Sequence, residues 1–133
     1  DHALQTATLA EADNASDEWI VASLCHDIGK FFSQFNHPKI AAEILKPYVS
    51  EEIYWSIAYH NIFQAVYIDS PKFNKTEFLK FREEPWFEAA KKFAGDWDEK
   101  AFYVDEHTRN LSYFEPLLAK VFNKVPYTNG FSD

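Results

Sequence analysis

The chain contains no run of alternating polar and apolar residues, so its pattern favours helices over a β-sheet. Ser50, followed by Glu51, is typical of a helix start, and Pro38 and Pro116 suit first helical turns. Gly29 is predicted to mark a helix end or a close approach of two segments. We predict helices at residues 2–12, 17–25, 38–45, 51–60, 86–102 and 114–123, a loop at 69–76 and an irregular tail. The predicted fold class is a compact all-α bundle.

Length and composition limit the class of protein. The 133 residues fit one domain, and an apolar content of 47% is enough for a packed core. A net charge of −8 argues against nucleic acid as a partner, and no apolar run is long enough to span a membrane. Cys25 is the single cysteine, which excludes an internal disulfide and favours a reducing, cytoplasmic location. Because the chain has no methionine, we expect residues 1–133 to be a single domain that lacks an N-terminal segment.

Four of the five histidines lie in or beside apolar helical segments: His2, His26, His37 and His60. Their irregular spacing fits no zinc finger and no HExxH motif. Ligands from several helices can nevertheless converge in the core of a bundle, and an aspartate can bridge two metal ions through its two oxygens. Since neighbours on a helix point about 100° apart, His26 and Asp27 would lie on the rim of one cavity. The alternative is that each histidine is a hydrogen-bonded core residue.

Two sequence segments carry a family resemblance. HALQTA at residues 2–7, followed by DEWIVASLCHDIGK at residues 17–30, resembles the HD-domain superfamily. The H-x-x-Q-T-A start is similar to its oxygenase branch, which includes myo-inositol oxygenase and a phosphonate-cleaving mixed-valent diiron oxygenase. The stretch that begins with GDWDEKAF at residues 95–102 is similar in layout to the last helical region of that branch. The resemblance implies an HD-domain helical bundle with a dimetal site in its core.

The resemblance also implies six metal ligands for two iron ions. One iron would be held by His2, His26, Asp27 and Asp98, and the other by Asp27, His37 and His60. Asp27 would therefore bridge the two ions. Imidazole and carboxylate ligands suit iron, with manganese or magnesium as the alternative, and the set leaves positions open for substrate and dioxygen.

Two other aspartates compete with Asp98 for the last ligand position. Asp96 lies in the same segment, and Asp105 is a weaker rival. The tryptophan before Asp98 resembles the aromatic residue that precedes this ligand in the branch, so Asp98 is preferred. His107 lies in the polar stretch DEHTRN and is expected at the surface.

Two polar residues are candidates for catalysis beside the metal ligands. Gln5 lies one helical turn from His2 and could orient a ligand or a water molecule, or it is only a polar residue on a helix face. Lys30 lies one turn beyond His26 and could place a cation on a substrate alkoxide or carboxylate, as both a catalytic and a substrate-binding residue. The alternative for Lys30 is a surface lysine at a helix end.

Three positions depart from the known oxygenases of the branch. Asn61 stands where myo-inositol oxygenase has small hydroxyl residues, and Phe102 replaces a lysine four residues after the last aspartate. Gln64 replaces a lysine of the phosphonate-cleaving enzyme. Asn61 and Gln64 therefore predict a neutral, hydrogen-bonding substrate pocket.

Three functions compete at this point. The preferred one is a mixed-valent diiron oxygenase that uses dioxygen to cleave a C–C or C–P bond of a small hydroxylated substrate. The alternative is a metal-dependent phosphohydrolase acting on a nucleotide or phosphate ester, which the supply of only two arginines, Arg82 and Arg109, disfavours weakly. The third is a metal-binding partner domain without catalysis. Nothing in the sequence indicates an oligomeric state.

Overall fold

The computed structural model describes residues 1–68, 71, 73–104, 107–127 and 131. These residues form helices and no β-strand, so the predicted all-α class is confirmed. The α-helices are α1 (His2–Ala12), α2 (Asp17–Cys25), α3 (His37–Leu45), α4 (Glu51–Ala58), α5 (His60–Gln64), α6 (Lys75–Leu79), α7 (Phe87–Lys92) and α8 (Leu111–Asn123). Short 3₁₀ turns lie at Ile28–Phe31 (η1), Lys46–Tyr48 (η2) and Lys100–Phe102 (η4), and a π-helix, η3 (Phe93–Glu99), follows α7 directly.

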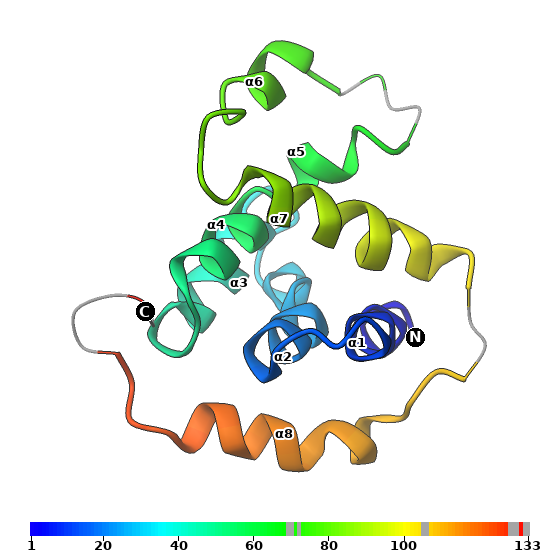
Figure 1. Ribbon diagram of the computed structural model, residues 1–133, viewed down its shortest axis with the longest axis vertical. Coiled ribbons are helices and arrows are strands. Elements are labelled where there is room, and N and C mark those ends of the chain that lie inside the picture. The colour runs from blue at the N-terminus through cyan, green and yellow to red at the C-terminus, as the bar shows by residue number, and fades with distance from the viewer. Residues whose placement is uncertain (69–70, 72, 105–106, 128–130, 132–133) are drawn as a thin grey trace.

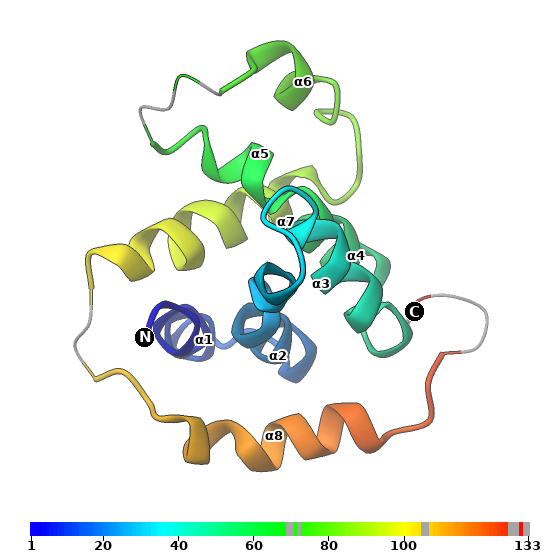
Figure 2. The same ribbon diagram turned by 180° about the vertical axis from the view of Figure 1, so that it is seen from behind.

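Helices α1 and α2 lie side by side in the centre of the molecule (Figure 1). Helix α8 crosses one side of this pair, and α7 with η3 runs along the opposite side. Helices α3 and α4 pack against each other beside α2, while α5 and α6 extend beyond α7 at one end (Figure 2). The central pair is therefore covered by other helices on several sides.

Side-chain caps explain why the first helices start where the sequence predicts. The carboxylate of Asp1 accepts hydrogen bonds from the first turn of α1, the hydroxyl of Ser16 accepts from the Trp19 N–H at the start of α2, and Ser50 does the same for Ile53 in α4. Each cap satisfies a backbone N–H that has no partner within its own helix. The predicted bounds 2–12 and 17–25 are confirmed.

Two apolar clusters fill the space between the helices. The larger one joins α1, α2, α3, α4, η3 and α8, and includes Ile20, Val21, Leu45, Ile57, Phe93 and Phe114. The smaller one joins α5, α6 and α7 through Phe63, Phe78, Trp86 and Phe87. Burial of each such side chain stabilises the fold by about 1.5–3 kcal/mol. No helix in the described part of the chain is both long enough and apolar enough to cross a membrane.

Two predicted segments differ from the structure around α5 and α6. The predicted helix 51–60 is wrong at its end, because α4 stops at Ala58 and α5 continues to Gln64 after a turn at Tyr59. The predicted loop 69–76 is wrong in its last two residues. Helix α6 begins at Lys75, since the Asn74 side chain accepts a hydrogen bond from the Glu77 N–H at 3.0 Å. Residues 69, 70 and 72 of that loop lie outside the described residues.

The C-terminal half brings two further corrections. Residues 87–102 are helical as predicted, but only α7 is an α-helix, and a π-helix and a 3₁₀ turn follow it. The last helix begins at Leu111 rather than at residue 114, because the Asn110 side chain accepts from the Tyr113 N–H at 2.9 Å. Pro116 therefore lies inside α8, where it leaves the Ser112 carbonyl without its usual helical donor. Within the predicted irregular tail 126–133, residues 126, 127 and 131 are irregular as predicted, and 128–130, 132 and 133 lie outside the described residues.

Gly29 sits at a close approach between η1 and the start of α3, as the sequence predicts. A Cβ atom at this position would lie 2.4 Å from the backbone oxygen of His37 and 2.8 Å from its Cα. A main-chain neighbour cannot move aside as a flexible side chain can, so the position admits only glycine without a shift of α3.

We expect Gly29→Ala to lower the free energy of unfolding by about 1–3 kcal/mol, the usual cost of overpacking. Urea denaturation followed by circular dichroism measures the change. Gly95→Ala is the matched control, since the three atoms nearest to a Cβ there belong to the ring of Tyr67, a side chain that is 43% exposed, and not to the main chain. Equal loss in both variants would contradict the assignment of main-chain contact as the cause.

Candidate metal centre

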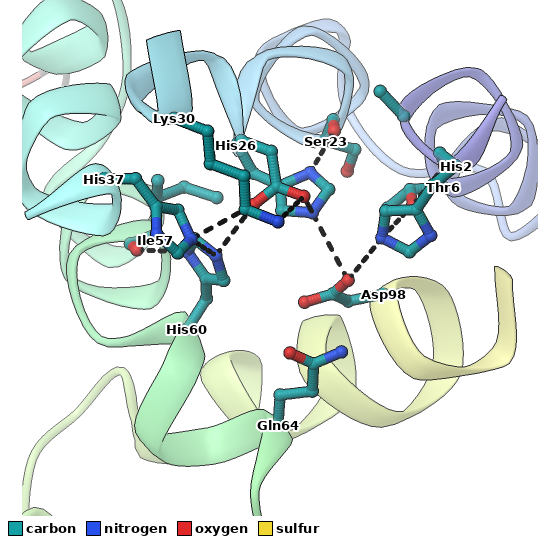
Figure 3. Close-up of polar contacts among 12 residues, drawn as sticks. His2, Thr6, Ser23, His26, Lys30, His37, Ile57, His60, Gln64 and Asp98 are labelled. Atoms are coloured by element: carbon teal, nitrogen blue, oxygen red, sulfur yellow. Dashed lines mark hydrogen bonds and ion pairs between the residues drawn. The ribbon is translucent and has the colours of Figure 1, made fainter. Parts of the chain in front are cut away.

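Six side chains from five segments converge between α1, α2, α3, α5 and η3 (Figure 3). His2 and His60 are the first residues of α1 and α5, and His37 is the first residue of α3. His26 and Asp27 follow the last residue of α2, and Asp98 lies in η3. Every histidine of the centre thus stands at a helix end, where side chains of several helices can reach a common point.

Asp27 lies in the middle of this group and has one carboxylate oxygen on each side. Its Oδ1 lies 3.3 Å from Nε2 of both His37 and His60. Its Oδ2 lies 3.3 Å from Nε2 of His26 and 3.4 Å from the Nζ of Lys30. The carboxylate therefore divides the centre into two halves that share it.

The pair His26 and Asp27 is not within a helix, although the sequence suggested ligands from one helix. Helix α2 ends at Cys25, and Asp27 has φ −104° and ψ 7°, in the sparsely populated bridge region. This turn after the helix directs the Asp27 carboxylate toward α3 and α5 and the His26 ring toward α1 and η3. The turn is thus the local reason that one dipeptide serves both halves.

Asp98 completes the half that contains His2 and His26. Its Oδ1 lies 2.8 Å from Nε2 of His2 and 3.3 Å from Nε2 of His26. Ligand atoms of these three residues lie within 4.8 Å of one another, as do those of His26, Asp27 and His60. The ring of Phe102 stacks on the His2 ring at 3.9 Å and covers its outer face.

Backbone carbonyls hold three of the four histidine rings. Nδ1 of His26 donates to the Ser23 carbonyl at 2.6 Å. Nδ1 of His37 and His60 donate to the carbonyls of Gln34 and Ile57, each at 2.8 Å. In its neutral form, a ring held in this way carries its proton on Nδ1 and presents an unprotonated Nε2 to the centre. This fixed orientation and tautomer are typical of histidines that bind a metal through Nε2.

Several nitrogen and oxygen atoms that face one another in the centre need a cation between them. Nε2 of His37 and Nε2 of His60 lie 3.2 Å apart, although each ring donates its Nδ1 hydrogen elsewhere. Nε2 of His26 and Oδ2 of Asp98 are buried and form no hydrogen bond with any described residue. Buried lone pairs without donors are costly, and divalent metal ions satisfy such a set. The donor set of imidazole nitrogens and carboxylate oxygens therefore fits a pair of metal ions.

The carboxylates of the centre also favour a proton on His26, which a bound metal ion would displace. Burial lowers the pKa of His26, but its contacts with Asp27 and Asp98 outweigh burial and raise the pKa to about 10. Burial also opposes ionisation of both aspartates, yet the neighbouring histidines hold the pKa of each carboxyl well below its usual range. Burial lowers the pKa of His37. Two ionised carboxylates thus lie among four imidazoles in a mostly buried space, where they attract cations strongly.

The structure separates the rival aspartates. Asp98 is 1% exposed and faces the centre, while the Asp96 side chain points to solvent and pairs with Lys92 at 3.2 Å. Residues two apart on a helix face different sides, so only one of the two can point inward. The weaker rival, Asp105, lies outside the described residues. His107 is exposed, as expected.

The predicted polar residues lie at different places around the centre. Lys30 is half-exposed, and its ammonium group lies beside Asp27 (Figure 3). Gln64 is half-buried and its amide end points toward the Asp98 side. Asn61 is exposed and lines, with Gln64, a hollow of about 270 Å³ beside α6. The catalytic and substrate-binding roles of these residues stay predictions.

Gln5 contacts the C-terminal part of the chain instead of the metal ligands. Its Oε1 accepts a hydrogen bond from the Thr108 hydroxyl, and its buried Nε2 has no partner among the described residues. Its predicted role as an orienting residue stays a prediction.

Sequence reasoning missed two buried polar residues here. The Thr6 hydroxyl donates to the His2 carbonyl at 2.8 Å and lies 3.5 Å from the His2 Nε2. Glu99 is buried directly after Asp98. The signal for Thr6 was its place one turn after His2 in HALQTA. Glu99 gave no signal, because a charged residue after a ligand is ordinarily solvated.

Comparison with known proteins gives two findings. A family model described as HD domain matches residues 1–98, a range that includes all six residues of the centre. The chain is also similar to the "[1-hydroxy-2-(trimethylamino)ethyl]phosphonate dioxygenase (glycine-betaine-forming)" of Leisingera caerulea, with 35% identity over 71 residues. That match covers 45% of this chain and 36% of the dioxygenase, so the chain matches about a third of the length of that relative.

We expect the protein to bind two divalent metal ions and His37→Ala to bind one fewer, since the variant removes a donor from one half only. Metal analysis after loading and dialysis measures the stoichiometry. The loaded protein should also unfold at a higher temperature than the metal-free protein, because a ligand that binds only the folded state stabilises it.

His107→Ala is the matched control for this experiment, since His107 is exposed and outside the centre. Loss of metal from the control, or an unchanged metal content in His37→Ala, would contradict the assignment.

Proposed function

The chain belongs to the HD domain family of metal-binding proteins, and we propose that it is a mixed-valent diiron oxygenase. In this proposal it uses dioxygen to cleave a C–C or C–P bond of a small hydroxylated substrate. The observation that carries the proposal is the division of one buried centre into two histidine-containing halves by a single carboxylate, Asp27.

The two halves differ in a way that suits an oxidative reaction. One half offers His2, His26, Asp98 and Oδ2 of Asp27, and the other offers only His37, His60 and Oδ1 of Asp27. Unequal numbers of donors favour unequal charge states of two irons and leave more open positions on the side of His37 and His60. When bound, the irons would supply Lewis acidity and the electrons for reaction with dioxygen.

Lys30 is the proposed residue for charge stabilisation beside Asp27. Its ammonium group lies 3.4 Å from Oδ2 of Asp27, and the side chain is 47% exposed. A substrate hydroxyl that approaches the centre beside Asp27 would meet this cation, which favours the alkoxide form over the neutral alcohol. Lys30 can thus bind the substrate and hold its oxygen anionic.

The dioxygenase that matches part of this chain supports the oxygenase class, but it does not identify the substrate. Its printed name describes a dioxygenase that acts on a hydroxylated phosphonate with a trimethylamino group. The phosphonate-cleaving oxygenase has a lysine four residues after its last histidine, and this chain has Gln64 at that position. We therefore do not propose a phosphonate group in the substrate of this chain. From this similarity we retain only the proposal of a small substrate with a hydroxyl group.

We expect iron-loaded protein, after anaerobic loading and partial oxidation, to show the electron paramagnetic resonance signal of a coupled Fe(II)/Fe(III) pair. The shared Asp27 carboxylate gives the two ions a common bridging ligand, which allows magnetic coupling. The measurement is the spectrum together with iron content per chain.

A matched variant makes this test specific. Asp27→Asn keeps the size of the side chain but removes its charge, and it should abolish the coupled signal. Two metal ions without a mixed-valent state, together with phosphate release from ester substrates with manganese or magnesium, would instead favour the phosphohydrolase.

We expect Lys30→Gln to lower kcat/KM by about 10²-fold, the usual loss when one stabilising group is removed from a developing oxyanion. Metal content should not change, because Lys30 is not among the proposed ligands. Lys80→Gln is the control, since Lys80 forms a similar i,i+3 pair with Glu77 far along the chain. An unchanged kcat/KM in Lys30→Gln would show that the lysine is only a surface residue.

A further inference from the structure

A continuous line of aromatic rings leads away from the metal centre. The buried ring of Phe93 contacts two of the imidazoles, with its centroid 5.4 Å from that of His26 and 6.4 Å from that of His60. The same ring lies 5.9 Å from Trp19 and 6.2 Å from Trp97, and the two indoles lie 5.4 Å from each other. Centroid separations of about 4.5–7 Å are those of packed rings. Phe93 therefore links the metal centre to both tryptophans.

The two tryptophans differ in their access to solvent. Trp97 is 3% exposed, whereas Trp19 is half-buried and lines a hollow of about 930 Å³ between α2 and α8. The line of rings thus begins at buried imidazoles and ends at an indole that solvent can reach. Because electron transfer between side chains becomes steeply slower with distance, packed rings in this order favour it.

The indole of Trp97 has a proton acceptor in place. Its Nε1–H donates to Oδ2 of Asp13 at 2.8 Å, and the Asp13 side chain is 46% exposed. The ammonium nitrogen of Lys92 lies 5.7 Å from the ring centroid of Trp97 and 3.7 Å from the same Oδ2. Since this cation opposes a positive charge on the indole, an oxidised Trp97 would release its Nε1 proton to Asp13.

Few other side chains can give up an electron close to the centre. The chain has no methionine and a single cysteine, Cys25, so sulfur offers few targets for oxidation. Indole and phenol rings lose an electron most readily among the remaining side chains. Within the described residues, the indoles of Trp19 and Trp97 contact Phe93, and no phenol ring contacts Phe93 or an imidazole of the centre.

We propose that Trp97 and Trp19 form an electron path that protects the metal centre from over-oxidation. When dioxygen is reduced there without substrate, the resulting oxidant would take one electron from Trp97 across Phe93. The oxidant gains that electron, the indole becomes a neutral radical, and its Nε1 proton moves to Asp13. Trp19 then gives an electron to Trp97, which recovers its proton from Asp13. A thiol in solution, oxidised to a disulfide, restores Trp19.

The electron path rests on the proposed function, since it needs a redox-active metal. The test exposes iron-loaded protein to hydrogen peroxide without substrate and stops the reaction by freezing. Peroxide accepts two electrons, one from iron and one from Trp97, and is reduced to water. Electron paramagnetic resonance detects the radical, and ring-deuterated tryptophan identifies it as an indole radical through the change in hyperfine splitting.

Peptide mass spectrometry then measures oxygen addition at each tryptophan. We expect oxygen addition at Trp97 and Trp19 and none at Trp55 and Trp86, whose described ring contacts include no imidazole of the centre. An oxidant that acts from solution would give a different order, because Trp55 is half-buried while Trp97 is 3% exposed. Zinc-loaded protein, which has no redox-active metal, is the matched control and should show no oxygen addition at Trp97.

Variants separate the electron path from core packing. Trp97→Phe should lose the radical signal. Asp13→Asn keeps the size of the side chain and an oxygen acceptor but removes the proton acceptor, so it should lower the radical yield, and Asp13→Glu should restore it. Asp96→Asn is the control, since Asp96 pairs with the same Lys92 at 3.2 Å and forms no hydrogen bond with the indole among the described contacts. Thermal unfolding shows whether each variant is folded, and if Trp97→Phe is not, Asp13→Asn decides.

Oxygen addition that follows solvent exposure, equal addition in zinc-loaded protein, or an unchanged signal in folded Trp97→Phe would overturn the electron path. The mixed-valent signal is recorded on the same samples before peroxide is added. Oxygen addition at Trp97 without a mixed-valent state would reject the diiron oxygenase and retain the electron path. A mixed-valent state without such addition would do the reverse.

Discussion

The shared carboxylate of Asp27 is the interaction on which the rest of the structure depends. Each of its oxygens faces a different group of histidines, at 3.3 Å on both sides. A largely enclosed carboxylate among imidazole rings is stable only if cations or protons accompany it. The folded chain therefore concentrates negative charge at one internal point, and α1, α3, α5 and η3 must all deliver side chains there.

The ends of the helices position these side chains. Three of the imidazoles donate to the carbonyl three residues earlier, at Ser23, Gln34 and Ile57. Those carbonyls lie in a helix end or a turn, where fewer intrahelical donors are available. Each hydrogen bond therefore gives a carbonyl its donor and, at the same time, fixes the orientation of a histidine ring. The same bond thus serves the stability of the fold and the chemistry of the site. Gly29 belongs to this arrangement, because its missing side chain lets η1 approach the backbone of His37.

Much of the fold could be predicted from the sequence wherever a local cap decides a boundary. Ser16 and Ser50 accept hydrogen bonds as expected, and α1 and α2 have the predicted bounds. The prediction was wrong where such a cap was overlooked or where no local signature exists. The π-helix at Phe93–Glu99 has no local signature in residues that all favour or tolerate an α-helix, and Pro116 indicated a start that Asn110 in fact supplies.

The candidate site could also be predicted only in part from the sequence. Composition alone singled out four histidines and Asp27, whereas Asp98 and the pairing of ligands depended on a family resemblance. The structure brings the six residues together, and their binding of metal stays a prediction. Glu99 could not be found from sequence, because its burial depends on the π-helix that was not predicted.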